Sequence, residues 1–152
     1  MTFLLDVNVL IALIDPAHLG HDAAHVWFER EGRSEWATCP ITRNGVIRIV
    51  GNPRYPNSPG SPAEVADIMR RLCRLEGHRF WPDAVDLFAD DVIDPSEIRT
   101  PAQVTDSYLL ALAALHDGRL ATFDHKLSVR AVRGGRGALH LIDGKAPHSD
   151  AG

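Results

Sequence analysis

Three aspartates stand where their carboxylates could act together. Asp6 directly follows the apolar run 3–5, and Asp124 directly follows the apolar run 119–123. Asp106 lies near the start of a helix that we expect over about residues 100–117. If the two runs are parallel strands, Asp6 and Asp124 reach the same edge of the sheet, and a helix can begin above that edge. Carboxylates gathered in this way repel one another unless a cation lies between them.

The chemistry expected of such a group is metal-assisted hydrolysis of a phosphodiester. Mg²⁺ prefers oxygen ligands, and it is usually held by a few carboxylates together with waters and substrate phosphates. A site of this kind can activate water and stabilise the charge that develops on phosphorus. Asn8, two residues after Asp6, could orient that carboxylate or a metal-bound water.

Each aspartate also has a simpler interpretation. An aspartate at a strand end often caps the following helix, and Asp106 could be stabilised by the dipole of its own helix. No single aspartate is specific evidence for a metal. The convergence of Asp6, Asp106 and Asp124 on one edge is what favours the metal site.

Two other groups of side chains have less specific patterns. His21 and His25 are four residues apart, as zinc ligands on a helix are, but no third ligand is evident and surface histidines are the favoured interpretation. Arg70, Arg71 and Arg74 form a basic cluster that could contact RNA, although a solvated helix face is the commoner role.

Short apolar runs alternate with amphipathic stretches along the chain. We expect strands at residues 3–5, 36–39, 79–81, 119–123 and 139–142, and helices over about 7–14, 21–30, 41–50, 61–77, 84–88, 100–117 and 127–132. Residues 52–60 are rich in Pro and Gly and should form an exposed loop. The alternation predicts an α/β fold with a mostly parallel central sheet and right-handed crossovers.

Helix boundaries carry local signals. Ser61 and Glu64 form a capping-box pattern with Pro62 in the first turn, and Thr100 and Gln103 repeat the pattern. Gly118 is expected to stop the helix that Thr100 opens.

The composition fits one soluble globular domain. The 152 residues are 45% hydrophobic and 24% charged, and no apolar run approaches the roughly 20 residues needed to span a bilayer. Residues 1–6 lack the features of a signal peptide, so we expect a cytoplasmic protein without membrane association.

Cys39 and Cys73 have no metal-binding spacing and are expected to be ordinary side chains. The net charge of −4 argues mildly against nucleic acid, but cations bound by carboxylates can contact phosphate themselves.

Segments 5–13, 38–48, 104–113 and 121–124 resemble the motifs of PIN-domain proteins, and more narrowly of the VapC toxins of bacterial toxin–antitoxin pairs. The resemblance runs from residue 1 to about 142 and implies a PIN-like, three-layer α/β/α domain over 1–142 with a loose tail over 143–152. It implies an endoribonuclease dependent on Mg²⁺, or Mn²⁺ as a substitute, with RNA as substrate, a cognate antitoxin and a homodimer. Asp6, Asp106 and Asp124 match the metal-binding acids of the family.

The sequence departs from the family pattern at Arg43, where many members carry Glu as a fourth acid. A cation cannot ligate a metal, so Arg43 would either weaken a second metal site or grip a phosphate; a solvent-facing side chain is the simpler alternative. Arg43 and Arg48 are therefore candidate substrate-binding residues.

Two other functions compete with the ribonuclease. The first is a PIN-fold module that Arg43 has made weak or inactive and that binds RNA or antitoxin without cutting. The second is an Asp-nucleophile phosphatase, which is disfavoured because Asn8 stands where that chemistry commonly needs a second Asp.

Overall fold

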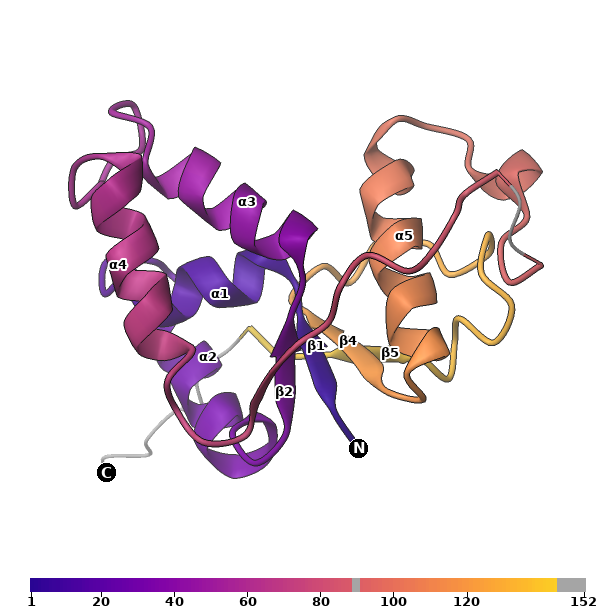
Figure 1. Cartoon of the computed structure of the whole chain (residues 1–152), viewed down its shortest axis with the longest axis horizontal. Coiled ribbons are helices and arrows are strands. Elements are labelled where there is room, and N and C mark those ends of the chain that lie inside the picture. Colours follow the sequence, from indigo (N-terminus) through magenta and orange to yellow (C-terminus); the bar gives the residue numbers. More distant parts are fainter. Residues whose placement is uncertain (89–90, 145–152) are drawn as a thin grey trace, which may run out of the picture.

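The computed structural model describes residues 1–88 and 91–144, and five short strands form one sheet. The sheet lies at the centre of the molecule (Figure 1). The strands are β1 (Phe3–Leu5), β2 (Trp36–Thr38), β3 (His78–Phe80), β4 (Arg119–Thr122) and β5 (Leu139–Leu141), in the order β3-β2-β1-β4-β5. All four pairings are parallel. The predicted α/β fold with a mostly parallel sheet is confirmed.

Helices cover both faces of the sheet and complete three layers (Figure 1). They are α1 (Val7–Ile14), α2 (His21–Trp27) with a π-helical extension (Phe28–Gly32), α3 (Pro40–Val50), α4 (Pro62–Leu72), a 3₁₀ turn (Pro95–Glu97) and α5 (Ala102–Leu115). The alternation of side chains along β1 fixes the layers. Phe3 and Leu5 belong to the core shared with α1–α4, whereas Leu4 belongs to the core shared with α5.

The capping signals explain where two of the helices begin. Asp6 caps α1 by accepting a hydrogen bond from the Val7 backbone N–H at 2.8 Å. Ser61 and Glu64 close the predicted capping box on α4, each side chain accepting from the other residue's backbone N–H. The second predicted box does not form, because Gln103 accepts from the Arg99 N–H instead of the Thr100 N–H and no side chain caps α5.

Two predicted helices are wrong. Residues 84–88 form no helix, and Phe88 is 94% exposed there, so a helix would have no buried face to stabilise it. Residues 127–132 form no helix either: the bonds Leu127 N–H to Asp124 C=O and Val132 N–H to Val129 C=O do not continue into a helical ladder, and Val132 forms an isolated antiparallel bridge with Ile93. A glycine-rich stretch follows at 134–137.

Several boundaries also shift by a few residues. Helix α4 ends at Leu72 rather than near Gly77, and α5 ends at Leu115 rather than Asp117. Asp117 has the positive φ of 53° at the end of α5, and the Gly118 N–H donates to the Ala113 carbonyl at 2.9 Å. Gly118 is still required, because a Cβ there would lie 2.5 Å from the Thr2 carbonyl oxygen.

Trp27 and Phe28, at the end of α2 and the start of its extension, are 6% and 3% exposed and lie in the core. None of the described helices is long and apolar enough to cross a membrane. The loose tail predicted over 143–152 lies, from residue 145 onward, outside the described residues.

Candidate active site

A cavity of about 400 Å³ opens beyond the carboxyl end of β1, where Asp6 and Asp106 lie. It is bounded by the start of α1, one side of α3 and the first turns of α5; its lining residues are Asp6, Val7, Ile41, Asn44, Gly45, Arg48, Ile49, Thr105 and Asp106. Gly45 lets α3 approach α1 closely, because a Cβ there would meet a Val7 methyl at 2.9 Å. The helices therefore hold the acids at the edge where parallel α/β sheets bind ligands.

Thr122, the last residue of β4, holds the buried carboxylate of Asp6. Its hydroxyl donates to Asp6 Oδ2 at 2.8 Å, while Asp6 Oδ1 accepts the capping bond from Val7. Thr122 is completely buried and Asp6 is 8% exposed. Each Asp6 oxygen therefore has one hydrogen bond and keeps a lone pair for another partner.

Asn8 contacts the end of β4 rather than Asp6 itself. Its Nδ2 donates to the Thr122 hydroxyl at 3.1 Å, and its Oδ1 accepts from the Phe123 N–H at 3.3 Å. The same hydroxyl accepts from the Asp124 N–H at 3.1 Å. Asn8 thus acts on both Asp6 and Asp124 through Thr122, so it is a positioning residue.

The three aspartates influence one another electrostatically. Burial, followed by the charges of Asp6 and Asp124, raises the pKa of Asp106 from 3.8 to about 6. Burial also raises the pKa of Asp6; the hydrogen bonds from Thr122 and Val7 oppose this shift, and the Asp124 charge adds to it. Asp6, Asp106 and Asp124 therefore lie near enough for the charges of Asp6 and Asp124 to disfavour ionisation of Asp106.

The donor set suits a hard divalent cation. Asp124 is exposed, and its Oδ1 accepts from the Lys126 N–H at 2.9 Å, so it too keeps free lone pairs. In the described residues, no three His, Cys, Asp or Glu side chains are gathered closely enough to hold an ion unaided. Mg²⁺ does not require such a cage, because it keeps several waters and is commonly held by one or two carboxylates with substrate phosphates. The residues present therefore fit Mg²⁺.

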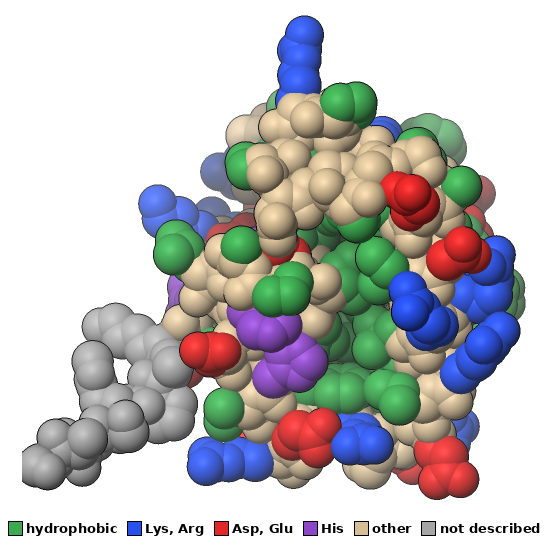
Figure 2. Space-filling model, turned by 90° about the vertical axis from the view of Figure 1, so that its left-hand side faces the viewer, with side chains coloured by type: hydrophobic (Ala, Val, Ile, Leu, Met, Phe, Trp, Pro, Cys, Tyr) green, Lys and Arg blue, Asp and Glu red, His purple; other side chains and the backbone are tan. Residues whose placement is uncertain are grey.

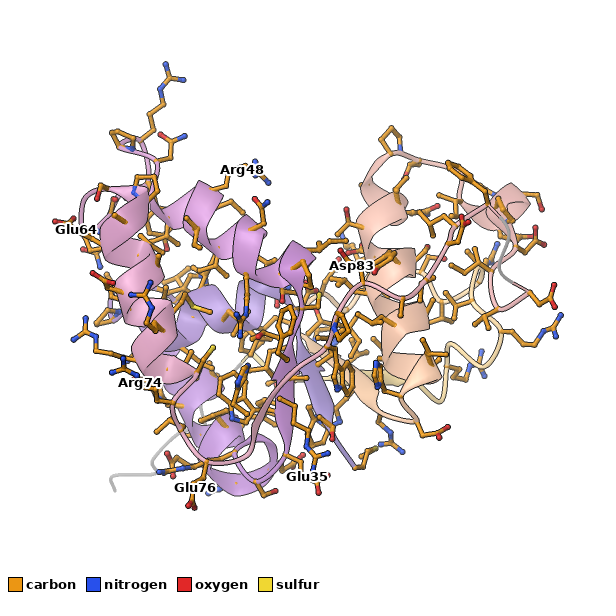
Figure 3. The ribbon with its side chains drawn as sticks, in the orientation of Figure 1. Glu35, Arg48, Glu64, Arg74, Glu76 and Asp83 are labelled. Atoms are coloured by element: carbon orange, nitrogen blue, oxygen red, sulfur yellow. The ribbon has the colours of Figure 1, made fainter. Side chains whose placement is uncertain are left out.

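The two candidate arginines lie on different sides of α3. Arg48 is exposed and lines the cavity of Asp6 and Asp106, and Figure 3 shows it on α3. Arg43 lines a separate cavity with α4 and β3, where its Nε donates to Thr38 Oγ1 at 2.9 Å. Of the alternatives open for Arg43, a role beside the three aspartates does not fit this position, because α3 turns the side chain to its other side.

Sequence reasoning did not single out two residues that belong to the site. Thr122 lies within the strand predicted at 119–123, so its side chain was assigned no role. Its hydroxyl is the common hydrogen-bond partner of Asp6, Asn8 and Asp124. A polar side chain immediately inside a strand that ends in a candidate acid was the available signal. Asn44, next to Arg43, lines the cavity with the acids.

Two histidines outside the site have structural partners. The rings of His21 and His25 lie against the backbone carbonyls of Ala12 and Leu13 at 2.7 and 2.9 Å, at the end of α1. This satisfies carbonyls that have no partner within the helix. The favoured interpretation as non-ligating residues agrees with this arrangement.

The PIN domain family model matches residues 3–132, and the chain belongs to that family. It is 46% identical over 134 residues to Ribonuclease VapC44 of Mycobacterium tuberculosis, covering 88% of this chain and 94% of that protein. It is 43% identical to Ribonuclease VapC39 (88% and 96% covered) and 40% identical to Ribonuclease VapC29 (84% and 90% covered), both from the same organism.

Proposed function

We propose that this protein is an endoribonuclease toxin of a toxin–antitoxin pair that hydrolyses RNA phosphodiester bonds with Mg²⁺, for which Mn²⁺ can substitute. The observation that carries the proposal is the position of Asp6 and Asp106 beside one cavity, with Asp124 near enough for its charge to raise the pKa of both. The relatives named as ribonucleases over nearly the same length support RNA as the substrate.

Each site residue has a distinct part in the proposed reaction. Asp6, Asp106 and Asp124 would hold the metal, which when bound lowers the pKa of water and offsets charge on the phosphate. Thr122, itself held by Asn8, fixes the direction of the Asp6 carboxylate and the backbone position of Asp124 before substrate arrives. Such preorganisation lowers the cost of reaching the transition state.

Arg48 is proposed to bind the phosphate of the substrate. It is the arginine among the residues lining the cavity of Asp6 and Asp106, and its guanidinium is exposed to solvent. A guanidinium matches the geometry of phosphate oxygens and stays charged at every physiological pH. It would offset the negative charge that the carboxylates present to an approaching RNA.

The cognate antitoxin, a homodimer and a cytoplasmic location are part of the same proposal. Figure 2 shows a hollow lined by hydrophobic side chains, with basic side chains on one rim and histidines on the other. A helix with an apolar face could cover such a hollow. The buried Trp27 and Phe28 would not contribute to it directly, because both are in the core.

The alternative of a module disabled by Arg43 has no geometric basis. That interpretation required the guanidinium to lie beside the carboxylates, and it lies instead against Thr38 and Phe80. Its charge therefore gives no reason to expect weak cleavage.

The experiment is incubation of the purified protein with total RNA and with a structured RNA, with Mg²⁺ or with EDTA. We expect discrete cleavage products with Mg²⁺ and none with EDTA. Asp124→Asn should abolish the products, whereas Asp91→Asn, on an exposed loop, should cleave as the parent does. Cleavage that persists in EDTA, or in Asp124→Asn, would refute the proposal.

A further inference from the structure

A second cavity, of about 540 Å³, lies on the other side of α3. Helices α3 and α4 and strand β3 enclose it, and its lining residues are Arg43, Ile47, Ala66, Met69, Arg70, Cys73, Arg74, His78 and Phe80. None of these lining residues is acidic. The cavity therefore combines an apolar floor with a rim that carries three arginines.

Arg43 is held in a fixed position in this cavity. Its Nε donates to Thr38 Oγ1 at 2.9 Å, and the ring of His78 lies 2.8 Å from the same oxygen. Its guanidinium carbon lies 4.6 Å from the centroid of the Phe80 ring. Because Thr38 is completely buried, the guanidinium is anchored from inside the protein before any ligand binds.

Phe80 is the exposed part of this arrangement. It is the last residue of β3 and is 49% exposed, although the Arg43 guanidinium lies over its ring. An aromatic ring and a planar guanidinium held together form the kind of surface on which nucleic-acid bases stack.

The remaining two arginines supply charge at the rim. Arg70 pairs with Asp67, and Arg74 lies just beyond the end of α4, where Figure 3 labels it. Within the part of the chain that the structure describes, no acidic side chain lines the cavity beside Arg43 and Arg74. Phosphates are the anions that suit several convergent arginines beside an aromatic ring.

The position of the cavity relates it to the proposed active site. Phe80 ends β3 as Leu5 ends β1, and because the strands are parallel both ends lie at the carboxyl edge of the sheet. Helix α3 separates the two cavities: Asn44 and Arg48 face the acids, and Arg43 and Ile47 face Phe80. An RNA strand that crosses the N-terminal part of α3 would reach both.

We propose that this second cavity binds an unpaired nucleotide of the RNA substrate, outside the cleaved bond, with its base on Phe80 and Arg43 and its phosphate at Arg74. The inference rests on the proposed function, because it assumes that RNA occupies the neighbouring site. An acidic segment of a protein partner would satisfy the arginines but would make no use of the aromatic and guanidinium planes. The stacking surface therefore favours RNA.

The test measures the affinity of a fluorescein-labelled, single-stranded oligoribonucleotide of about 12 nucleotides, by anisotropy. Asp124→Asn protein in EDTA is the background, so that the RNA stays intact. Phe80→Ala and Phe80→Leu should each weaken binding about tenfold, whereas Phe80→Trp should retain it because an indole also stacks. Arg74→Ala should reduce the slope of log affinity against log salt by about 0.7, the value for one phosphate contact on a single strand.

Arg71→Ala is the matched control. Arg71 is exposed in the last turn of α4, but it does not line the cavity, so its loss should leave the affinity close to that of the background protein. Thermal unfolding of each variant confirms that the fold is intact. Equal effects of Arg71→Ala and Arg74→Ala would refute a specific phosphate contact.

Cleavage of two substrates separates this inference from the proposed function. With Asp124 intact and Mg²⁺ present, Phe80→Ala should lose cleavage of the long RNA but cleave a dinucleotide as the parent does. If Phe80→Ala binds and cleaves the long RNA like the parent, the proposed nucleotide site is refuted, whereas the proposed ribonuclease function is not affected. If the parent cleaves neither substrate, the proposed function itself fails. A glutamate-rich peptide can be tested in the same way. If the Phe80 and Arg74 variants lose affinity for this peptide but keep the parent's affinity for RNA, the cavity binds a protein partner instead.

Discussion

Replacing Asp106 by asparagine should stabilise the metal-free protein at pH 7. The raised pKa of Asp106 means that the folded protein disfavours its charged form, first because of burial and then because of Asp6 and Asp124. Asparagine has nearly the same shape without the charge. The variant should therefore lose the repulsion while keeping the packing of α5.

The size of the effect follows from the pKa difference. A shift from 3.8 to about 6 corresponds to about 3 kcal/mol if it is taken at face value. Asp106 is partly exposed, so solvent screening reduces this to about 1 kcal/mol. In a protein of 152 residues that is a rise in Tm of about 3 °C.

The sign of the pH dependence is fixed by the direction of the shift. Because the folded-state pKa lies above the unfolded value, the folded protein binds more protons between the two, and stability falls as the pH rises from about 4 to about 6. The advantage of Asp106→Asn should be complete at pH 7 and should vanish near pH 4.

The assay is thermal unfolding in EDTA at pH 4.5 and pH 7, with Asp91→Asn as the control. Saturating Mn²⁺ should then stabilise the parent more than Asp106→Asn, because binding to the folded state alone raises stability. A variant that is less stable than the parent at pH 7 in EDTA, or whose advantage is the same at both pH values, would refute the reasoning.

Two further perturbations test the framework around the site. Thr122→Val should cost about 2 kcal/mol in urea unfolding and most of the RNA cleavage, because it leaves Asp6 and Asn8 without a shared partner; Thr122→Ser keeps the hydroxyl and should behave like the parent. Asp15 is 6% exposed; burial raises its pKa, but hydrogen bonds from Tyr55, from Asn57 and from a backbone N–H outweigh burial and lower it. The charged form of Asp15 should therefore stabilise the fold at pH 7, and this stabilisation should be lost as the pH falls below 3.8. Asp15→Asn should lower the free energy of unfolding by about 2 kcal/mol at neutral pH and by progressively less in acid. An unchanged deficit at pH 3 would contradict that assignment.

Strands β1 and β4 and the acids after them could be predicted, because each is a short and mainly apolar run that an aspartate closely follows. Asp6 and Asp124 follow β1 and β4 closely, so the topology alone brings them to one edge. The capping pattern at Ser61 correctly predicted the residue at which α4 begins. These features depend on residues that are near one another in the sequence.

The direction of Arg43 could not be predicted in the same way. Sequence spacing shows which residues share a face of α3, but not which neighbour that face meets. The neighbours are α1 and α5 on one side and α4 and β3 on the other, and only the folded chain places Arg43 with the second group. The family pattern at this position therefore suggested a contact with the acids that the fold does not make.

The two absent helices have a related cause. Short stretches such as 84–88 and 127–132 have too few residues for propensity to decide their structure. Phe88 is almost fully exposed and gives the first stretch no packing to stabilise a helix, whereas the second packs Leu127 and Val132 into the core without forming one. Thr122 was overlooked for the opposite reason, because its hydroxyl gains its role from Asn8, 114 residues away in the sequence.

Calorimetric titration with Mn²⁺ tests most directly the claim that three aspartates form one metal site. The metal-free parent should bind Mn²⁺, and Asp6→Asn, Asp106→Asn and Asp124→Asn should each bind at least about tenfold more weakly, a loss of about 1.4 kcal/mol. Asp91→Asn, with the same change of charge on an exposed loop, should match the parent. Equal Mn²⁺ affinity in the parent and in the three site variants would contradict the account.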